Sequence, residues 1–291
     1  MKNTDYDVIV VGAGPVGSTA ARYAAKNGAR VLMIEDHASI GSPVSCTGLL
    51  STRAVSECDI RPSDDFVLNR VRGAFVHPMN GTCLPIDGKE TKAYVVSRKN
   101  FDTGLAAMAL ETGVDLKLNT RAVALESENS IRKLSVMEEG NLRTIKAKVI
   151  IGADGVRSRI AGMAGLGQVK KIMPGIQIEA PYQSPDTDFV ELFVGSQAPG
   201  FFGWTVPVDD NISRIGLAID CNCNENASIC LDKLLKNNKH INARYGGGQA
   251  DLVVGGIPIG PSEKTYAEGT LIVGDAAGQV KPTSGGGIYT G

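Results

Sequence analysis

A glycine-rich turn near the N-terminus constrains this chain more than any other feature. The apolar run at 8–11 is followed by glycines at GxGxxG spacing, which are Gly12, Gly14 and Gly17. Small residues then predict a helix over about 15–27, and the run at 30–35 predicts a second strand that ends at Glu35. A strand, helix and strand in this order open an α/β domain with a parallel sheet.

Each glycine of this turn has a mechanical reason. Gly12 permits the tight turn, Gly14 lets the backbone approach a diphosphate, and Gly17 lets the helix pack closely on the strand. Pro15 begins the helix without wasting a donor, and Val16 follows it in the first turn. We therefore expect all five residues to bind a dinucleotide, although an ordinary glycine-rich turn has the same spacing.

The acidic end of the second strand completes the prediction. The N-terminus of the helix attracts a diphosphate, and the Glu35 carboxylate can accept hydrogen bonds from ribose hydroxyls, with Asp36 beside it. Glu35 would also repel a 2′-phosphate. The motif does not separate FAD from NAD.

Two later segments favour FAD. Residues 149–158 read VIIGADGVRS and residues 271–278 read LIVGDAAG. Both resemble segments of the p-hydroxybenzoate hydroxylase superfamily of flavoproteins, in which the Asp of the second segment binds the ribityl or ribose part of FAD. The resemblance implies FAD as cofactor, with contacts from these two segments at Asp154, Gly155, Gly274, Asp275 and Gly278.

The whole chain most resembles the geranylgeranyl reductases, which include archaeal digeranylgeranylglycerophospholipid reductases. The segments that resemble this family are IGSPVSC at 40–46, Ser-Arg at 97–98 and KPTSGGGIY at 281–289. The resemblance implies FAD contacts at Cys46, Thr47, Arg98, Ala122, Asp275, Gly287 and Ile288. The chain departs from the family at Ser45, where Arg is usual, and at 47–49, where an Ala-Glu-Gly-like sequence is usual.

The glycines at 285–287 predict the start of a helix. By analogy with the superfamily, its N-terminus would lie near the flavin pyrimidine and stabilise negative charge on the reduced ring. A flexible glycine linker is the alternative. A chain that stops at residue 291 would leave this helix uncovered, so we expect a further C-terminal region.

The segment PGFFGWTVP at 199–207 resembles the aromatic-x-Trp-x-Phe-Pro substrate motif of the same family, with Val206 in place of Phe. Large rings suit an isoprenoid chain, whose burial depends on apolar area. We expect Phe202, Trp204 and Pro207 to contact the substrate. Trp204 could instead be a core residue, and flavin-dependent halogenases have a similar tryptophan motif.

The resemblance implies reduction of C=C bonds in a polyprenyl lipid by hydride transfer from N5 of reduced FAD. Cys46 is the candidate for proton delivery, with a packing thiol as the alternative. The other hypotheses are a flavin monooxygenase or halogenase, and an electron-transfer flavoprotein that acts with a quinone. The electron donor stays open between a ferredoxin, NAD(P)H and a reduced quinol-type donor.

The expected architecture is a discontinuous Rossmann-type FAD domain with an inserted α+β substrate domain that contains an antiparallel sheet. The FAD domain is predicted over 1–70, 90–167 and 263–291, and the substrate domain over 71–89 and 168–262. Helices over 99–112 and 227–237 and strands at 115–118, 131–138 and 142–151 belong to this prediction.

Composition excludes several classes of protein. The formal net charge of -1 gives no general attraction to nucleic acid. No apolar stretch approaches the ~18 residues of a spanning helix, so we expect a cytoplasmic protein with peripheral membrane contact through its lipid substrate. The six cysteines form no disulfide pattern. Cys221, Cys223 and Cys230 lack the spacing of a metal site, and structural thiols are the preferred interpretation.

Overall fold

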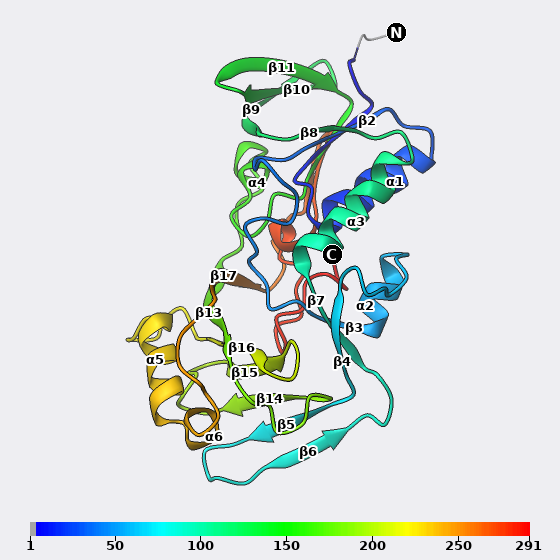
Figure 1. Ribbon diagram of the computed structural model, residues 1–291. Helices are drawn as coiled ribbons and strands as arrows, with labels where there is room; N and C mark the ends of the chain where they lie inside the picture. Colours follow the sequence, from blue (N-terminus) through cyan, green and yellow to red (C-terminus); the bar gives the residue numbers. More distant parts are fainter. Residues whose placement is uncertain (1–3) are drawn as a thin grey trace. The chain divides into compact units, whose positions relative to one another are not determined.

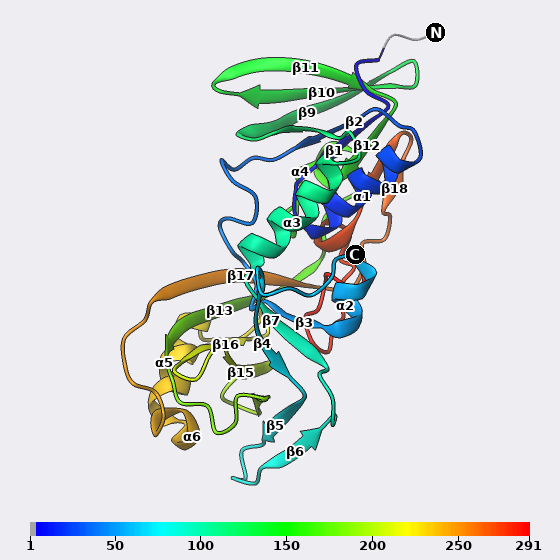
Figure 2. The same ribbon diagram turned by 45° about the vertical axis from the view of Figure 1, so that its right-hand side comes forward.

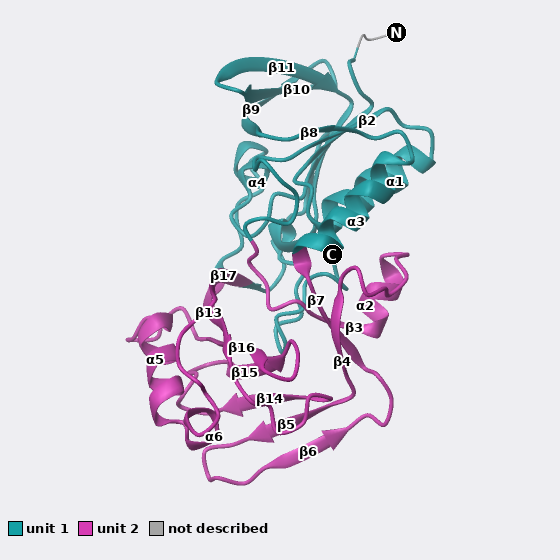
Figure 3. Cartoon of the chain, in the orientation of Figure 1, with its two compact units in different colours: residues 1–43, 99–171, 258–291 teal, residues 44–98, 172–257 magenta. Residues whose placement is uncertain are grey.

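The computed structural model describes residues 4–291 and divides into two compact units. Unit 1 comprises 1–43, 99–171 and 258–291, and unit 2 comprises 44–98 and 172–257 (Figure 3). The sequence predicts 44–70 and 90–98 in the FAD domain. The structure differs because strands from these two stretches pair with each other in a sheet of unit 2 and share a hydrophobic cluster with it.

Unit 1 is built on a six-stranded sheet whose order is β18-β19-β12-β1-β2-β8. The strands are β1 (Val8–Val11), β2 (Val31–Ile34), β8 (Asp115–Lys117), β12 (Val149–Gly152), β18 (Tyr266–Ala267) and β19 (Thr270–Ile272). All neighbours pair in parallel except β18, which is antiparallel to β19. The central strands are apolar throughout, as a sheet covered on both faces requires.

Two helices cover one face of this sheet. They are α1 (Pro15–Lys26) and α3 (Arg98–Leu110), which run side by side in Figures 1 and 2. Val10 and Met33 on the strands pack with Ala21 of α1 and Ala106 of α3 in one buried cluster. Small residues on both helices let them approach the sheet closely, which agrees with the helices expected from the sequence.

The other face is covered by a three-stranded antiparallel sheet and a short helix. These elements are β9 (Thr120–Glu128), β10 (Ile131–Glu138), β11 (Asn141–Ala147) and α4 (Arg159–Met163). Ile9 and Ile34 of the parallel sheet pack against Leu134, Val136 and α4 residue Ile160. The sequence predicted β10 and β11 as a hairpin but did not predict β9 (Figure 2).

Unit 2 contains a seven-stranded sheet of order β17-β13-β16-β15-β14-β5-β6 and a three-stranded sheet of order β3-β7-β4. The larger sheet comprises β5 (Gly73–His77), β6 (Leu84–Asp87), β13 (Lys171–Pro181), β14 (Phe189–Val194), β15 (Phe202–Pro207), β16 (Ile212–Ala218) and β17 (Asp251–Ile259). The smaller sheet comprises β3 (Leu49–Ser51), β4 (Val67–Val71) and β7 (Ala93–Val96). The predicted class is confirmed: a Rossmann-type parallel sheet with helices, and a second unit with antiparallel pairing in both of its sheets, in which only β5 and β14 are seen to pair in parallel.

The two faces of the seven-stranded sheet have different partners. One face packs against α5 (Ala227–Asn237) and α6 (Lys239–Asn242), with Ile215, Leu217 and Phe193 in the shared core. The opposite face packs Val206 and Val190 against strands of the smaller sheet. The remaining elements are α2 (Thr52–Glu57) and a 3₁₀ helix, η1 (Gly274–Ala277).

Candidate active site

Four neighbouring parallel strands of unit 1 end at one edge of the sheet, and each carries a predicted motif there. In the order β19-β12-β1-β2, the strands lead into Gly274, Asp154, Gly12 and Glu35. Ligands of open α/β sheets bind outside the carboxyl ends of the strands. The fold thus brings together residues that are up to 262 positions apart.

The glycines of the first turn are required by contacts inside the protein. Gly12 has a φ of +103°, and a Cβ there would lie 2.4 Å from the Ala153 carbonyl oxygen. A Cβ on Gly17 would lie 1.9 Å from the Gly12 carbonyl oxygen. Only glycine allows the helix, the turn and the neighbouring strand to approach this closely.

Gly14 differs from the other two glycines. It is the N-cap of α1, its φ of −69° suits any residue, and no protein atom lies within 4 Å of the position of a Cβ. A side chain at position 14 would therefore point into open space in front of the N-terminus of α1, whose first residue is Pro15. An open backbone at the N-terminus of a twelve-residue helix fits the diphosphate of FAD.

Glu35 lies beside this turn, as the sequence predicted. Its Oε2 accepts a hydrogen bond of 2.9 Å from the Ala13 N–H, and its Oε1 accepts one of 3.1 Å from the His37 N–H. These bonds hold the carboxylate at the strand end, where ribose hydroxyls of a dinucleotide can reach it. Asp36 instead accepts two bonds of 2.7 and 2.9 Å from Arg121 Nε, so its carboxylate is occupied by β9.

The Gly-Asp segment contacts the first turn directly. A Cβ on Gly274 would lie 3.1 Å from Val16 Cγ2, and the Gly274 N–H donates a 2.7 Å hydrogen bond to Gln279 Oε1. Sequence reasoning did not single out Gln279, which has no motif of its own. Gly278 ends η1 with a φ of +69° and packs against the Gly260 carbonyl.

The glycines at 285–287 were expected to begin a helix. The structure has turns at 282–284 and 288–290, with one helix-type bond of 2.9 Å from the Gly291 N–H to the Gly287 carbonyl. One such bond is the first of a helical turn, so the start of a helix here stays a prediction. Gly287 lies next to Asp275, since a Cβ on it would be 2.6 Å from Oδ1, and Ile288 follows half-buried.

Asp154 acts on the helix that follows it. Its Oδ1 accepts a 2.6 Å bond from the Ser158 hydroxyl, and its Oδ2 accepts bonds of 2.7 and 3.0 Å from the N–H groups of Arg159 and Ile160. Oδ2 therefore caps α4, Oδ1 holds its N-cap residue Ser158, and Gly155 makes the turn with a φ of +78°. The sequence had assigned Asp154 to the cofactor.

Ala122 lies on β9, and its side chain is part of the hydrophobic core. The β9–β10 register shifts next to it, so Val123 has no partner opposite and the strand is bulged there. Any contact of Ala122 with a ligand would therefore involve its backbone.

In unit 2, the predicted residues Cys46, Thr47 and Arg98 gather around Gly48. The Gly48 N–H donates a 3.3 Å hydrogen bond to Cys46 Sγ, and Arg98 Cγ lies 3.6 Å from the position of a Cβ on Gly48. The Thr47 carbonyl accepts a 2.6 Å bond from Arg214 Nη1. The sequence did not single out Arg214.

Two of the three predicted substrate residues share a face of β15. Phe202 and Trp204 stack edge to face at 5.9 Å, and the indole N–H donates a 2.9 Å bond to Gln177 Oε1. The indole also lies on Gly216, where a Cβ would be 2.7 Å from Cζ2. Pro207 is buried and lies on the opposite face, because side chains alternate along a strand.

A buried polar cluster occupies that opposite face. The Glu191 carboxylate, 1% exposed, accepts hydrogen bonds from Tyr182 at 2.6 Å, Thr205 at 3.0 Å and Arg244 at 2.9 Å. His77 Nε2 lies 3.0 Å from it. Burial lowers the pKa of His77, and burial together with Glu191 raises the pKa of Tyr182 well above its usual value. Both groups are therefore neutral near pH 7.

The cysteines of residues 4–291 show no sign of a metal-binding site. Burial, followed by the neighbouring Cys223, raises the pKa of Cys230, as in an unreactive thiol. Within these residues no three His, Cys, Asp or Glu side chains are grouped so that they could hold a metal ion. None of their helices is long and apolar enough to cross a membrane.

Known proteins agree with this geometry. The model of the FAD dependent oxidoreductase family matches residues 7–167. A digeranylgeranylglycerophospholipid reductase of Methanocaldococcus jannaschii is 37% identical over 294 residues, covering 99% of this chain and 74% of that protein. The chain belongs to the digeranylgeranylglycerophospholipid reductase family. It is an FAD-dependent oxidoreductase, and the resemblance seen in its sequence is confirmed.

Solved structures agree with membership of the reductase family. A geranylgeranyl bacteriochlorophyll reductase-like protein of Thermoplasma acidophilum has a TM-score of 0.91 at 32% identity, covering 98% of this chain and 74% of that one. A flavin-dependent halogenase has a TM-score of 0.75 at 17% identity, covering 100% of this chain and 56% of that one. The halogenase shows a shared fold alone.

Proposed function

We propose that this chain saturates C=C bonds of a geranylgeranyl lipid, of the kind named by its digeranylgeranylglycerophospholipid reductase relatives. The observation that carries the proposal is 37% identity to such a reductase over 99% of the chain. The meeting of four motif-bearing strand ends supports the cofactor part. When bound, reduced FAD supplies the hydride.

The residues of unit 1 hold the cofactor in this proposal. The open backbone at Gly14 and the N-terminus of α1 bind the diphosphate, and Glu35 accepts hydrogen bonds from ribose hydroxyls. Asp275, next to Gly287, binds the ribityl or ribose part. We keep the predicted FAD contact of Ala122 and assign it to the backbone. We give Asp154 a structural role because its oxygens bond Ser158 and the first two N–H groups of α4.

The residues of unit 2 hold the substrate and supply the proton. Phe202 and Trp204 offer an apolar surface to the prenyl chain. Adding hydrogen across an alkene needs a hydride at one carbon and a proton at the other, and we assign the proton to the Cys46 thiol. A proton from solvent must then restore the thiol in each cycle.

The decisive test is anaerobic and needs no natural electron donor. The full chain with FAD, reduced by dithionite and freed of excess reductant, is mixed with digeranylgeranylglycerophospholipid. Flavin reoxidation and a mass gain of two hydrogens per double bond are expected. Failure to reoxidise with any prenyl lipid would refute the substrate assignment. Substrate-dependent oxygen consumption would favour a monooxygenase or halogenase, and turnover with quinone alone an electron-transfer protein.

Two variants test the proton assignment. Cys46→Ala is expected to lower kcat about a hundredfold while FAD stays bound, since general acid catalysis contributes about that much. Cys83→Ala is the matched control, because Cys83 is an exposed thiol outside every predicted motif. Equal rates of the two variants would make Cys46 a packing residue.

A lipid substrate also implies that the enzyme works at a membrane surface. We propose peripheral contact of the chain with lipid bilayers. Flotation with liposomes made of the lipid substrate and a carrier phospholipid tests this, and a protein that stays at the bottom of the gradient contradicts it.

A further inference from the structure

Arg214 is a charged residue on the same face of the large sheet of unit 2 as Trp204. It lies on β16, opposite Val206 of β15 and Glu179 of β13. Its side chain is only 12% exposed. An arginine removed from water to this extent requires hydrogen-bond acceptors for its guanidinium group.

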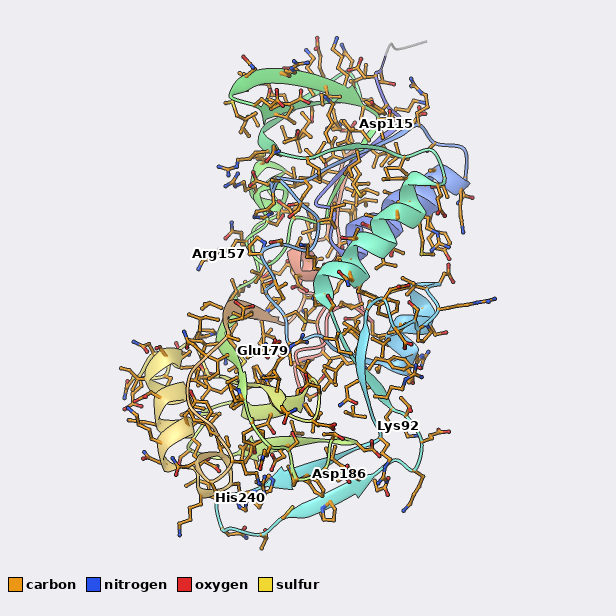
Figure 4. All side chains as sticks on the ribbon, in the orientation of Figure 1. Lys92, Asp115, Arg157, Glu179, Asp186 and His240 are labelled. Atoms are coloured by element: carbon orange, nitrogen blue, oxygen red, sulfur yellow. The ribbon has the colours of Figure 1, made fainter. Side chains whose placement is uncertain are left out.

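The acceptors come from three parts of unit 2. Arg214 Nε donates a 3.0 Å bond to Oε2 of Glu179, which lies on the neighbouring strand β13 and is labelled in Figure 4. Arg214 Nη1 donates to the Thr47 carbonyl at 2.6 Å and to the Val96 carbonyl at 3.0 Å. The planar guanidinium fixes the angle between these bonds, so Glu179 orients the group toward the two carbonyls.

The two carbonyls belong to the segments that carry predicted site residues. Thr47 stands between Cys46 and the start of β3, and Val96 ends β7, two residues before Arg98. The segments already pair, because the Val96 N–H donates a 2.8 Å bond to the Gly48 carbonyl. Arg214 joins the Thr47 carbonyl to this pair.

The turn around Cys46 also comes close to backbone atoms of two neighbouring strands. Gly48 has a φ of +75°, and a Cβ on it would lie 2.6 Å from the Val96 carbonyl and 2.7 Å from Arg214 Nη1. A Cβ on Gly255 of β17 would lie 2.9 Å from the Ser45 carbonyl. With the turn in this place, the Gly48 N–H donates to Cys46 Sγ at 3.3 Å.

We propose that Arg214 is a positioning residue for the reductase reaction: by holding the Thr47 and Val96 carbonyls, it fixes the turn that aims the Cys46 thiol. The assignment rests on the proposed function in giving Cys46 the proton. A purely structural Arg–Glu pair within the sheet would need only Glu179. Of the two bonds from Nη1, one ends on the Thr47 carbonyl of the turn and the other on the Val96 carbonyl at the end of β7, so losing them frees the turn from the strand beside it.

The first experiment measures how accessible the Cys46 thiol is, and it needs no prenyl substrate. Full-length protein with FAD is alkylated with iodoacetamide, and the rate is followed for each cysteine by peptide mass spectrometry. In Arg214→Met we expect Cys46 to react on the order of tenfold faster, because local opening exposes a half-buried thiol. The rates of Cys83 and Cys221, which are exposed, stay constant.

Two further variants and a control accompany it. Arg214→Lys keeps a charged donor without the fork to Glu179, so it should restore part of the protection. Gly48→Ala disturbs the turn from the other side and should accelerate Cys46 as Arg214→Met does. Arg70→Met removes an arginine whose ion pair spans 4.0 Å at the surface of the same unit, and should change nothing.

The second experiment measures turnover. In Arg214→Met we expect kcat for prenyl reduction to fall about tenfold to a hundredfold with KM within about threefold, because a thiol displaced by an ångström loses catalysis rather than binding. Arg214→Lys should recover part of kcat. A loss confined to KM, or one that Arg214→Lys does not recover, would overturn the positioning role.

The two readouts separate this inference from the proposed function. If the wild-type protein reduces no prenyl lipid but Arg214→Met accelerates alkylation of Cys46, the proposed function is refuted and the role of Arg214 in holding the turn is supported. If the wild type is active and folded Arg214→Met leaves both Cys46 alkylation and kcat unchanged, the inference is refuted. Should Arg214→Met not fold, Arg214→Lys and Gly48→Ala decide by the same criteria.

Discussion

Replacing Glu191 is expected to destabilise unit 2 more than most single substitutions. The carboxylate is 1% exposed and accepts bonds from Tyr182, Thr205 and Arg244, with His77 at 3.0 Å. In Glu191→Ala these groups lose their hydrogen-bond acceptor while they remain largely removed from water. The guanidinium of Arg244, with 29% of its side chain exposed, is left without this counter-charge.

The size of the effect follows from the partners. Removing one member of a buried ion pair costs about 3–5 kcal/mol, so we expect that loss for Glu191→Ala. Glu191→Gln keeps the volume but presents an N–H₂ group to donors, and should cost about 2–3 kcal/mol. Thr205→Val removes a single hydroxyl donor of nearly equal shape and should cost about 1–2 kcal/mol.

The chain carries its own probe for this measurement. Trp204 is the only tryptophan and lies on β15 of the same sheet, so its fluorescence in urea reports the unfolding of unit 2. Glu263→Ala is the control, because it removes an exposed ion pair with Lys170 in unit 1 and should leave the midpoint unchanged. A loss below about 1 kcal/mol for Glu191→Ala, at an unchanged m-value, would refute this account of the cluster.

Three other predictions follow from the geometry. Gly14→Ala should fold normally and lose FAD, since its Cβ meets only open space, whereas Gly17→Ala should lower thermal stability as well; flavin absorbance and thermal melting separate the two. Asp154→Ala should cost about 1 kcal/mol through the lost helix cap without changing the flavin content. Burial lowers the pKa of His77, so the unfolded protein binds a proton at this imidazole more readily than the folded protein. The contribution of His77 to stability is therefore fully present above about pH 6.5 and is lost as the pH falls below it. In urea titrations, His77→Gln should reduce this dependence of the unfolding free energy on pH.

The parts of the fold that depend on local pattern could be predicted from the sequence. The strand at 8–11 and the helix at 227–237 match the structure to the residue, because a short apolar run and helical spacing are properties of neighbouring residues. β9 was missed because it follows β8 after two residues and ends in a polar stretch that resembles a loop.

In the candidate site, likewise, residues that belong to a local motif could be predicted and residues that act through distant contacts could not. The glycines of the first turn and Glu35 are motif residues and lie where they were expected. Arg214 could not be found, because its contact with Thr47 joins residues 167 positions apart and its neighbours in sequence form no motif. The sequence alone does not show that Asp154 caps α4, because a helix cap and a cofactor ligand need the same acidic residue after a strand.

Neither unit is a continuous stretch of chain, and this bears on how the protein is made. The parallel sheet of unit 1 includes β19, whose residues 270–272 are synthesised after all of unit 2. A ribosome that has released only the first 170 residues therefore exposes a sheet with the apolar flank of β12 uncovered. Unit 1 can be completed only after the last residue of unit 2, at 257, has been made, and no terminal deletion can release one of the two units intact.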